Sequence, residues 1–155
     1  MEILRNQKKD NQNFIASVQV DQTPEKVFAA INNIRGWWSE DVDGNTDKLD
    51  EEFLYRDKHL WCRMKITELI PGKKIVWHVL ESQMDNFEGG TEWNGTSLIF
   101  EIARKEGKTE IQFTHFGLVP DFGCYTVCSK AWSFYIQTSL QKLITTGKGD
   151  PIKKK

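Results

Sequence analysis

The stretch that decides the fold runs from residue 124 to residue 144 and reads CYTVCSKAWSFYIQTSLQKLI. Its apolar and small residues recur with alternating steps of three and one, at Cys128, Ala131, Trp132, Tyr135, Ile136, Ser139, Leu140, Leu143 and Ile144. This spacing predicts one long helix with a wide apolar face, ending near Gly147. Because a helix of about 20 residues is about 30 Å long, it needs a large apolar surface to lie against.

The rest of the chain supplies that surface, because its apolar and polar residues alternate as they do in half-buried strands. Strands are predicted within residues 14–20, 53–57, 60–66, 74–81, 98–102 and 111–115. A first helix is predicted to begin at Thr23-Pro24, since Thr is a good N-cap and Pro suits the first helical position. The acidic, turn-rich residues 41–52 favour a loop. This order indicates an α+β fold, with an antiparallel sheet wrapped around the C-terminal helix.

The length of the chain indicates one domain, which we place at residues 13–147, with flexible termini at 1–12 and 148–155. Its net charge of −1 argues against a general attraction to nucleic acid, and no apolar run approaches the ~18 residues of a membrane span. Three cysteines without a framework spacing favour reduced thiols and a cytoplasmic location. Six Trp and nine Phe indicate a large aromatic core or an aromatic-lined cavity.

His115 is the polar residue of most interest. Strict alternation places it on the same strand face as Ile111 and Phe113, which is the face expected to meet the helix. A polar group there needs a partner from the protein, from water or from a ligand. Two interpretations stay open: a core-edge histidine bonded to backbone or water, and a histidine that contacts a ligand through an imidazole that both donates and accepts.

Other chemical motifs are weak. Cys124 and Cys128 share a helix face and, with His115, suggest a metal site, but no fourth ligand is placed and two small buried thiols explain the spacing as well. No nucleophile motif and no glycine-rich phosphate loop occurs. We therefore predict no metal, no cofactor and no catalytic residue. Whether the chain is an enzyme stays open, with a role as a non-enzyme favoured.

Three segments together resemble a known superfamily. They are VQVDQTPEKVFAAI at residues 18–31, ITELIPGKKIVW at 66–77 and TEIQFTHFGL at 109–118, followed by a last helix that contains Trp132. In this order they are similar to the START-like, or SRPBCC, superfamily, in the branch related to the activator of the heat-shock-chaperone ATPase. The resemblance implies a helix-grip fold, in which a curved antiparallel sheet grips the C-terminal helix around a hydrophobic cavity. Its members bind lipids, sterols, polyketides or plant hormones, and some are cyclases, hydrolases or co-chaperones.

The leading functional hypothesis is a module that binds a small hydrophobic or amphipathic molecule, lipid-like, polyketide-like or aromatic, with a stress-related role. The residues expected to contact the ligand are His115, Phe113, Phe100, Trp132, Trp38, Met64 and Tyr135. Concave, mostly apolar surfaces with few polar groups are typical of ligand pockets. The first alternative is an interaction module for a chaperone or another protein. The second is a cyclase or hydrolase that acts in the same cavity.

Overall fold

The computed structural model describes residues 13–85, 90–120 and 122–153. In this part of the chain, seven strands form one antiparallel sheet in the order β1-β7-β6-β5-β4-β3-β2. The strands are β1 (Phe14–Val20), β2 (Val42–Gly44), β3 (Glu52–Arg56), β4 (Leu60–Ile70), β5 (Lys74–Met84), β6 (Ser97–Lys105) and β7 (Lys108–Phe116). Two register irregularities in the β4–β5 pair, at Arg63/Met64 and at Ile66/Glu68, help to curve the sheet.

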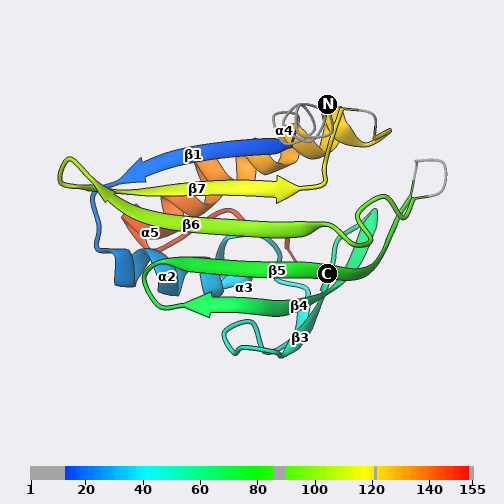
Figure 1. Cartoon of the computed structure of the whole chain (residues 1–155), viewed down its shortest axis with the longest axis horizontal. Coiled ribbons are helices and arrows are strands. Elements are labelled where there is room, and N and C mark those ends of the chain that lie inside the picture. Colours follow the sequence, from blue (N-terminus) through cyan, green and yellow to red (C-terminus); the bar gives the residue numbers. More distant parts are fainter. Residues whose placement is uncertain (1–12, 86–89, 121, 154–155) are drawn as a thin grey trace, which may run out of the picture.

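The helices cover one face of this sheet, as Figure 1 shows. They are α2 (Pro24–Asn32), α3 (Ile34–Trp37) and a C-terminal helix built from α4 (Tyr125–Phe134), η1 (Tyr135–Leu140) and α5 (Gln141–Thr146). The Thr23 hydroxyl accepts a hydrogen bond from the Lys26 backbone amide at 3.2 Å, so the predicted start of α2 is confirmed. The predicted α+β architecture is also confirmed. None of the described helices is long and apolar enough to cross a membrane.

The C-terminal helix differs from the prediction in its middle, where η1 is π-helical. The apolar stripe has a period of four residues, and four residues overshoot a 3.6-residue turn by about 40° each time. In a straight α-helix, Leu140 would therefore rotate away from the face that carries Cys128. The wider π turn, with i→i+5 hydrogen bonds, absorbs this excess. As a result Cys128, Trp132, Ile136 and Leu140 are all buried.

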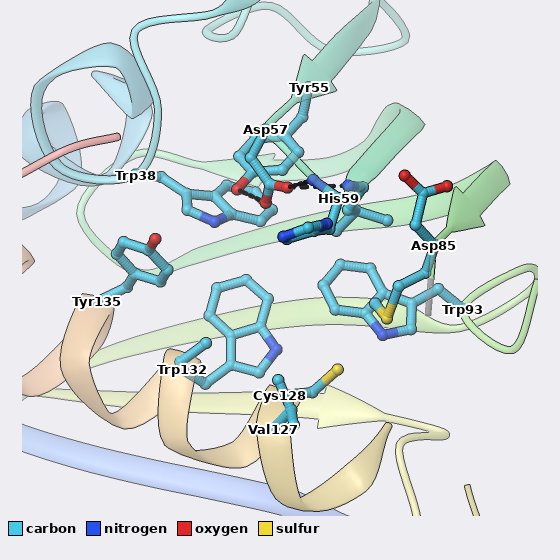
Figure 2. A pocket seen from close by; sticks show the side chains of 13 residues that line it. Trp38, Tyr55, Asp57, His59, Asp85, Trp93, Val127, Cys128, Trp132 and Tyr135 are labelled. Carbon is cyan, nitrogen blue, oxygen red and sulfur yellow. Dashed lines mark hydrogen bonds between the residues drawn. The ribbon is translucent and has the colours of Figure 1, made fainter. Parts of the chain in front are cut away.

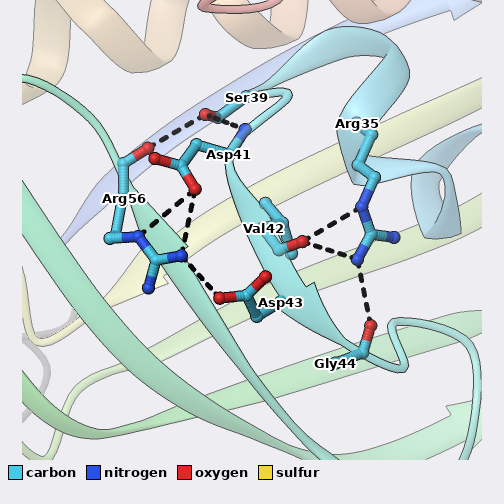
Figure 3. Close-up of polar contacts among 7 residues, drawn as sticks. All are labelled: Arg35, Ser39, Asp41, Val42, Asp43, Gly44 and Arg56. Carbon is cyan, nitrogen blue, oxygen red and sulfur yellow. Dashed lines mark hydrogen bonds and ion pairs between the residues drawn. The ribbon is translucent and has the colours of Figure 1, made fainter. Parts of the chain in front are cut away.

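β2 corrects the prediction of a loop at residues 41–52. It pairs with β3, placing Val42 opposite Tyr55. Figure 3 shows the contacts that hold it. The Arg35 guanidinium of α3 donates to the carbonyl of Val42 at 2.7 Å and to that of Gly44 at 3.1 Å. Arg56 forms ion pairs with Asp41 and Asp43. The strand therefore depends on side chains that lie elsewhere in the sequence.

The C-terminal tail also corrects the prediction, because residues 148–153 pack on the domain instead of being free. The Ile152 amide donates to the Trp38 carbonyl at 2.9 Å, and the Ile152 carbonyl accepts from the Glu40 amide at 2.8 Å. The Asp150 amide donates to the Ser139 hydroxyl at 2.8 Å. Gly147 ends the helix with φ 88°, as predicted. Residues 1–12, also predicted to be flexible, lie outside the described residues.

We predict that Gly149→Ala destabilises the protein by about 1–3 kcal/mol. A Cβ at this position would lie 2.5 Å from the Gly36 carbonyl oxygen and 2.8 Å from that of Ser139, so the tail has to move. Chemical denaturation measures the change. The neighbouring Lys148→Ala is the control, because Lys148 is exposed and should change the stability by less than about 0.5 kcal/mol. Equal stability of the two variants would contradict the packed tail.

Candidate functional site

A pocket of about 370 Å³ opens between the C-terminal helix and the ends of β3 and β5. Figure 2 shows side chains of the helix on one side of it and residues from the strand ends on the other. Thirteen of the described residues line it: Trp38, Tyr55, Asp57, His59, Leu60, Met84, Asp85, Trp93, Val127, Cys128, Ala131, Trp132 and Tyr135. Its volume lies within the range of roughly 300–1,000 Å³ that is common for small-molecule sites.

Four aromatic rings form a continuous wall of this pocket. Tyr55 stacks on Trp38 with ring centres 4.0 Å apart, Trp38 lies 4.9 Å from Trp132, and Trp132 stacks on Trp93 at 5.8 Å. Each of the four residues is at most 5% exposed, so their rotamers are fixed by packing. The rings come from β3, the end of α3, the helix α4 and the loop before β6. The wall is therefore formed only when the whole domain has folded.

His115 does not line this pocket, which corrects its expected role as the main polar contact of a ligand. It is completely buried on β7, behind Trp132. The Trp132 indole N–H donates to Nδ1 of His115 at 3.0 Å, and Nε2 lies 2.9 Å from the hydroxyl of Thr96. Both ring nitrogens therefore have partners within the protein. His115 is therefore a core residue, as the first interpretation held, but its partners are two side chains and not backbone or water.

The donors in this chain of hydrogen bonds follow from the chemistry of Trp132. An indole nitrogen can only donate, so Nδ1 of His115 must accept and Nε2 must carry the proton. Nε2–H then donates to Thr96, whose hydroxyl donates to the Trp93 carbonyl at 2.6 Å. The imidazole is thus neutral, and complete burial lowers its pKa from 6.5 to about 3. The chain connects α4, β7 and the loop that carries Trp93.

The polar groups of the pocket lie at its rim. The Asp57 carboxylate accepts hydrogen bonds from the Tyr55 hydroxyl at 2.8 Å and from the backbone amides of His59 and Leu60 at 2.7 and 2.8 Å. Burial, and then the charge of Asp57, raise the pKa of Tyr55 and raise that of Tyr135 to about 12. Both phenols are therefore neutral hydrogen-bond donors at physiological pH. The Tyr135 hydroxyl has no hydrogen-bond partner among the described residues, so it can serve a ligand.

Two thiols lie beside this pocket at the start of α4. A hydrogen bond between them lowers the pKa of Cys124 and, together with burial, raises that of Cys128, so Cys128 is protonated. The buried Trp93 indole N–H has no hydrogen-bond partner in the described part of the chain. Glu92 accepts hydrogen bonds from the backbone amides of Gly123 and Cys124. These contacts hold the Trp93 loop against the helix.

The structure brings three of the seven predicted ligand-contact residues together, namely Trp38, Trp132 and Tyr135. Phe113, Phe100 and Met64 are completely buried and lie outside the pocket lining. Phe113 packs on Trp132 with ring centres 4.5 Å apart, and Phe100 packs on Phe113 at 5.0 Å. The space beneath the middle of the sheet is thus filled by side chains. The pocket is confined to one end of the helix.

The residues predicted to contact a ligand did not include the rim, which consists of Asp57, His59 and Asp85. The signal available was only that Asp57 and His59 flank a turn and that Asp85 begins an irregular segment.

His78 lies outside the pocket lining, with its Nδ1 atom 3.1 Å from the Ser97 hydroxyl. Within residues 13–85, 90–120 and 122–153, no group of three or more His, Cys, Asp or Glu side chains could hold a metal ion. The arrangement is suited to binding an apolar body with a polar group at the rim.

A curved antiparallel sheet around a long C-terminal helix defines a helix-grip protein of the START-like class. Within this class, residues 21–145 match the family of Activator of Hsp90 ATPase homolog 1-like proteins, and the chain belongs to that family. Among curated proteins, none matches it by sequence.

Solved structures of other proteins share the fold. The Aha1 dimer from Colwellia psychrerythraea has a TM-score of 0.72 at 24% identity, covering 88% of this chain and 98% of the other. Protein MLL2253 from Mesorhizobium loti has a TM-score of 0.69 at 13% identity, covering 86% and 96%. DynU16, from the dynemicin biosynthetic locus, has a TM-score of 0.67 at 10% identity; the match covers 89% of this chain and 49% of DynU16. At these identities the likeness is one of fold.

The buried His115 predicts a loss of stability in mild acid. Between pH 6.5 and about 3 the unfolded chain binds a proton at this histidine that the folded protein excludes, so stability falls as the pH drops below 6.5. From pH about 7.5 to about 4.5, the wild type should lose about 2–3 kcal/mol more than His115→Gln, which cannot titrate. Urea denaturation at both pH values measures the difference.

Equal losses for the two proteins would show that the imidazole reaches solvent. Should His115→Gln fail to fold, an NMR titration of the wild-type imidazole decides the same question. A transition near the ordinary histidine value of 6.5 would contradict burial.

Proposed function

We propose that this protein binds a small hydrophobic or amphipathic molecule in the pocket between the C-terminal helix and the ends of β3 and β5. The observation that supports this most strongly is the aromatic wall of Tyr55, Trp38, Trp132 and Trp93. Large aromatic side chains usually bury their faces in the core, but here they line a space of about 370 Å³. An apolar wall of this kind gains free energy when a ligand displaces water from it.

The wall is also pre-organised, which favours binding. Trp132 is fixed by its hydrogen bond to His115, and Trp93 by the stack on Trp132. Because these rings are buried and packed, little conformational entropy is lost when a ligand arrives. A ligand with a flat, rigid body matches such a surface best.

An enzymatic role in the same pocket has less support. Cys128 is the thiol that lines the pocket, and its raised pKa keeps it protonated and a weak nucleophile. His115, a second titratable side chain near the pocket, has both ring nitrogens occupied inside the core. Binding is therefore the activity that we propose.

Ala131→Phe should block binding without unfolding the protein. Ala131 lies on α4, is exposed and lines the pocket, so a phenyl ring there can occupy the space of a ligand. The neutral fluorescent probe N-phenyl-1-naphthylamine, titrated into wild type and variant, should bind the variant at least about tenfold more weakly. A tenfold loss of affinity is the size expected when one well-placed apolar contact between the probe and the pocket is lost.

Thr138→Phe is the matched control, since Thr138 is exposed on the same helix and lies outside the pocket lining. It should bind the probe as the wild type does. Equal binding by all three proteins would place the probe elsewhere, and no binding by the wild type would contradict the proposed function.

A second candidate is a role as a partner of a heat-shock chaperone, which membership of the Activator of Hsp90 ATPase homolog 1-like family favours. Both candidates suit a reducing compartment such as the cytoplasm, where the free, buried thiols Cys62, Cys124 and Cys128 would persist. Purified Hsp90 with this protein added should hydrolyse ATP faster than alone if the second candidate holds. An unchanged ATPase rate would exclude activation as its role.

A further inference from the structure

We propose that the pocket selects a cationic ligand, in which a flat hydrophobic body carries an ammonium group that is held at the rim by Asp57 and Asp85. This inference rests on the proposed function, because it names the chemical class of the molecule bound in the same pocket. It follows from three features of the site: the charges that line it, the way Asp57 is held, and the aromatic rings beneath the rim.

The charges that line the pocket are predominantly negative. Among the described residues, its lining contains the carboxylates of Asp57 and Asp85, the imidazole of His59, and neither Lys nor Arg. Two carboxylates outweigh one imidazole whether or not His59 carries a proton, so the rim is negative in both cases. Lys58, in the same turn, is exposed and does not line the pocket. A cation is therefore attracted to this rim, and an anion is repelled.

Asp57 is held in place by donors that carry no charge. Its two oxygens accept from the backbone amides of His59 and Leu60 and from the Tyr55 hydroxyl. Such donors orient a carboxylate without cancelling its negative charge. Within the described residues, Asp57 forms no ion pair with a Lys or Arg. The charge of Asp57 is thus left for a ligand.

Asp85 lies on the same rim as Asp57, as Figure 2 shows. Its backbone amide donates to the His59 carbonyl at 2.7 Å, so the end of β5 is tied to the turn that Asp57 begins. The Asp85 side chain is exposed, which lets it follow the position of a ligand's charge. The two carboxylates come from different strands and share one opening.

The aromatic wall adds to this preference for a cation. The face of an indole or phenol ring carries partial negative charge, and cations are attracted to it, most strongly to tryptophan. Among the described residues, three tryptophans and two tyrosines line the pocket. Tyr135 also offers a hydroxyl, which is uncharged and close enough to Asp57 for that carboxylate to raise its pKa. The carboxylate of a fatty acid would be repelled by the charges of Asp57 and Asp85 at this rim.

The test uses three probes that share a naphthalene body and differ only in their head groups. They are (2-naphthylmethyl)trimethylammonium, 2-naphthalenemethanol and 2-naphthylacetate, titrated into the intact protein by isothermal calorimetry at neutral pH. In about 20 mM salt the cation should bind about tenfold or more tighter than the alcohol, and the acetate should bind most weakly. In about 300 mM salt only the affinity for the cation should fall appreciably.

Asp85→Asn should weaken binding of the cation about threefold or more and leave the affinity for the alcohol unchanged. This variant is chosen because Asp85 is exposed, whereas Asp57 organises a turn and its replacement endangers folding. Asp21→Asn is the matched control, since it removes the same charge from an exposed position outside the pocket lining. It should bind all three probes as the wild type does.

Equal affinities for cation and alcohol, or tightest binding of the acetate, would overturn the cationic ligand while leaving the proposed pocket function intact. The proposal of a cationic ligand is also overturned if Asp85→Asn and Asp21→Asn weaken binding of the cation equally, because the effect would then come from the net charge of the protein alone. If no probe binds, and N-phenyl-1-naphthylamine does not bind either, the proposed function fails together with this inference.

Discussion

The position of Trp132 is the constraint on which the rest of this structure depends. Its indole N–H donates to His115, and its ring packs on Phe113, Trp38 and Trp93 at centre-to-centre distances of 4.5, 4.9 and 5.8 Å. One side chain thereby joins the C-terminal helix to β7, to the end of α3 and to the loop before β6. Because the same ring is a wall of the pocket, the shape of the pocket is set by the packing of the core.

Much of the fold could be predicted from the sequence, because strand alternation and the helical stripe are local patterns. The period of four residues in that stripe also contained the sign of a π turn, since Cys128 and Leu140 cannot share the face of a straight α-helix. β2 and the packed tail could not be predicted. They depend on Arg35 and Ser139, which reach them from 7 and 11 positions away in the chain and leave no pattern in the segment itself.

The site was less accessible to sequence reasoning than the fold. Trp38, Trp132 and Tyr135 were found because aromatic residues at a helix end or on a helical stripe are visible in one segment. The rim was missed because Asp57 and Asp85 belong to different strand ends and meet only through the sheet. Alternation gave the correct strand face for His115 but not how deeply its side chain is buried. That burial depends on Thr96 and on the loop that carries Trp93.

The polar groups of this protein fall into two sets with different physical roles. Inside the core, Trp132, His115 and Thr96 use their donors and acceptors on one another or on the backbone, so they stabilise one arrangement and have no capacity left for a ligand. At the rim, the Asp57 carboxylate accepts only from uncharged donors within the described residues, and the Tyr135 hydroxyl has no partner among them. Since the rim is built on strand ends and turns, its charge can change while the buried aromatic wall stays the same. Under the proposed function, the aromatic core therefore fixes the size and shape of the ligand, and the rim selects its charge.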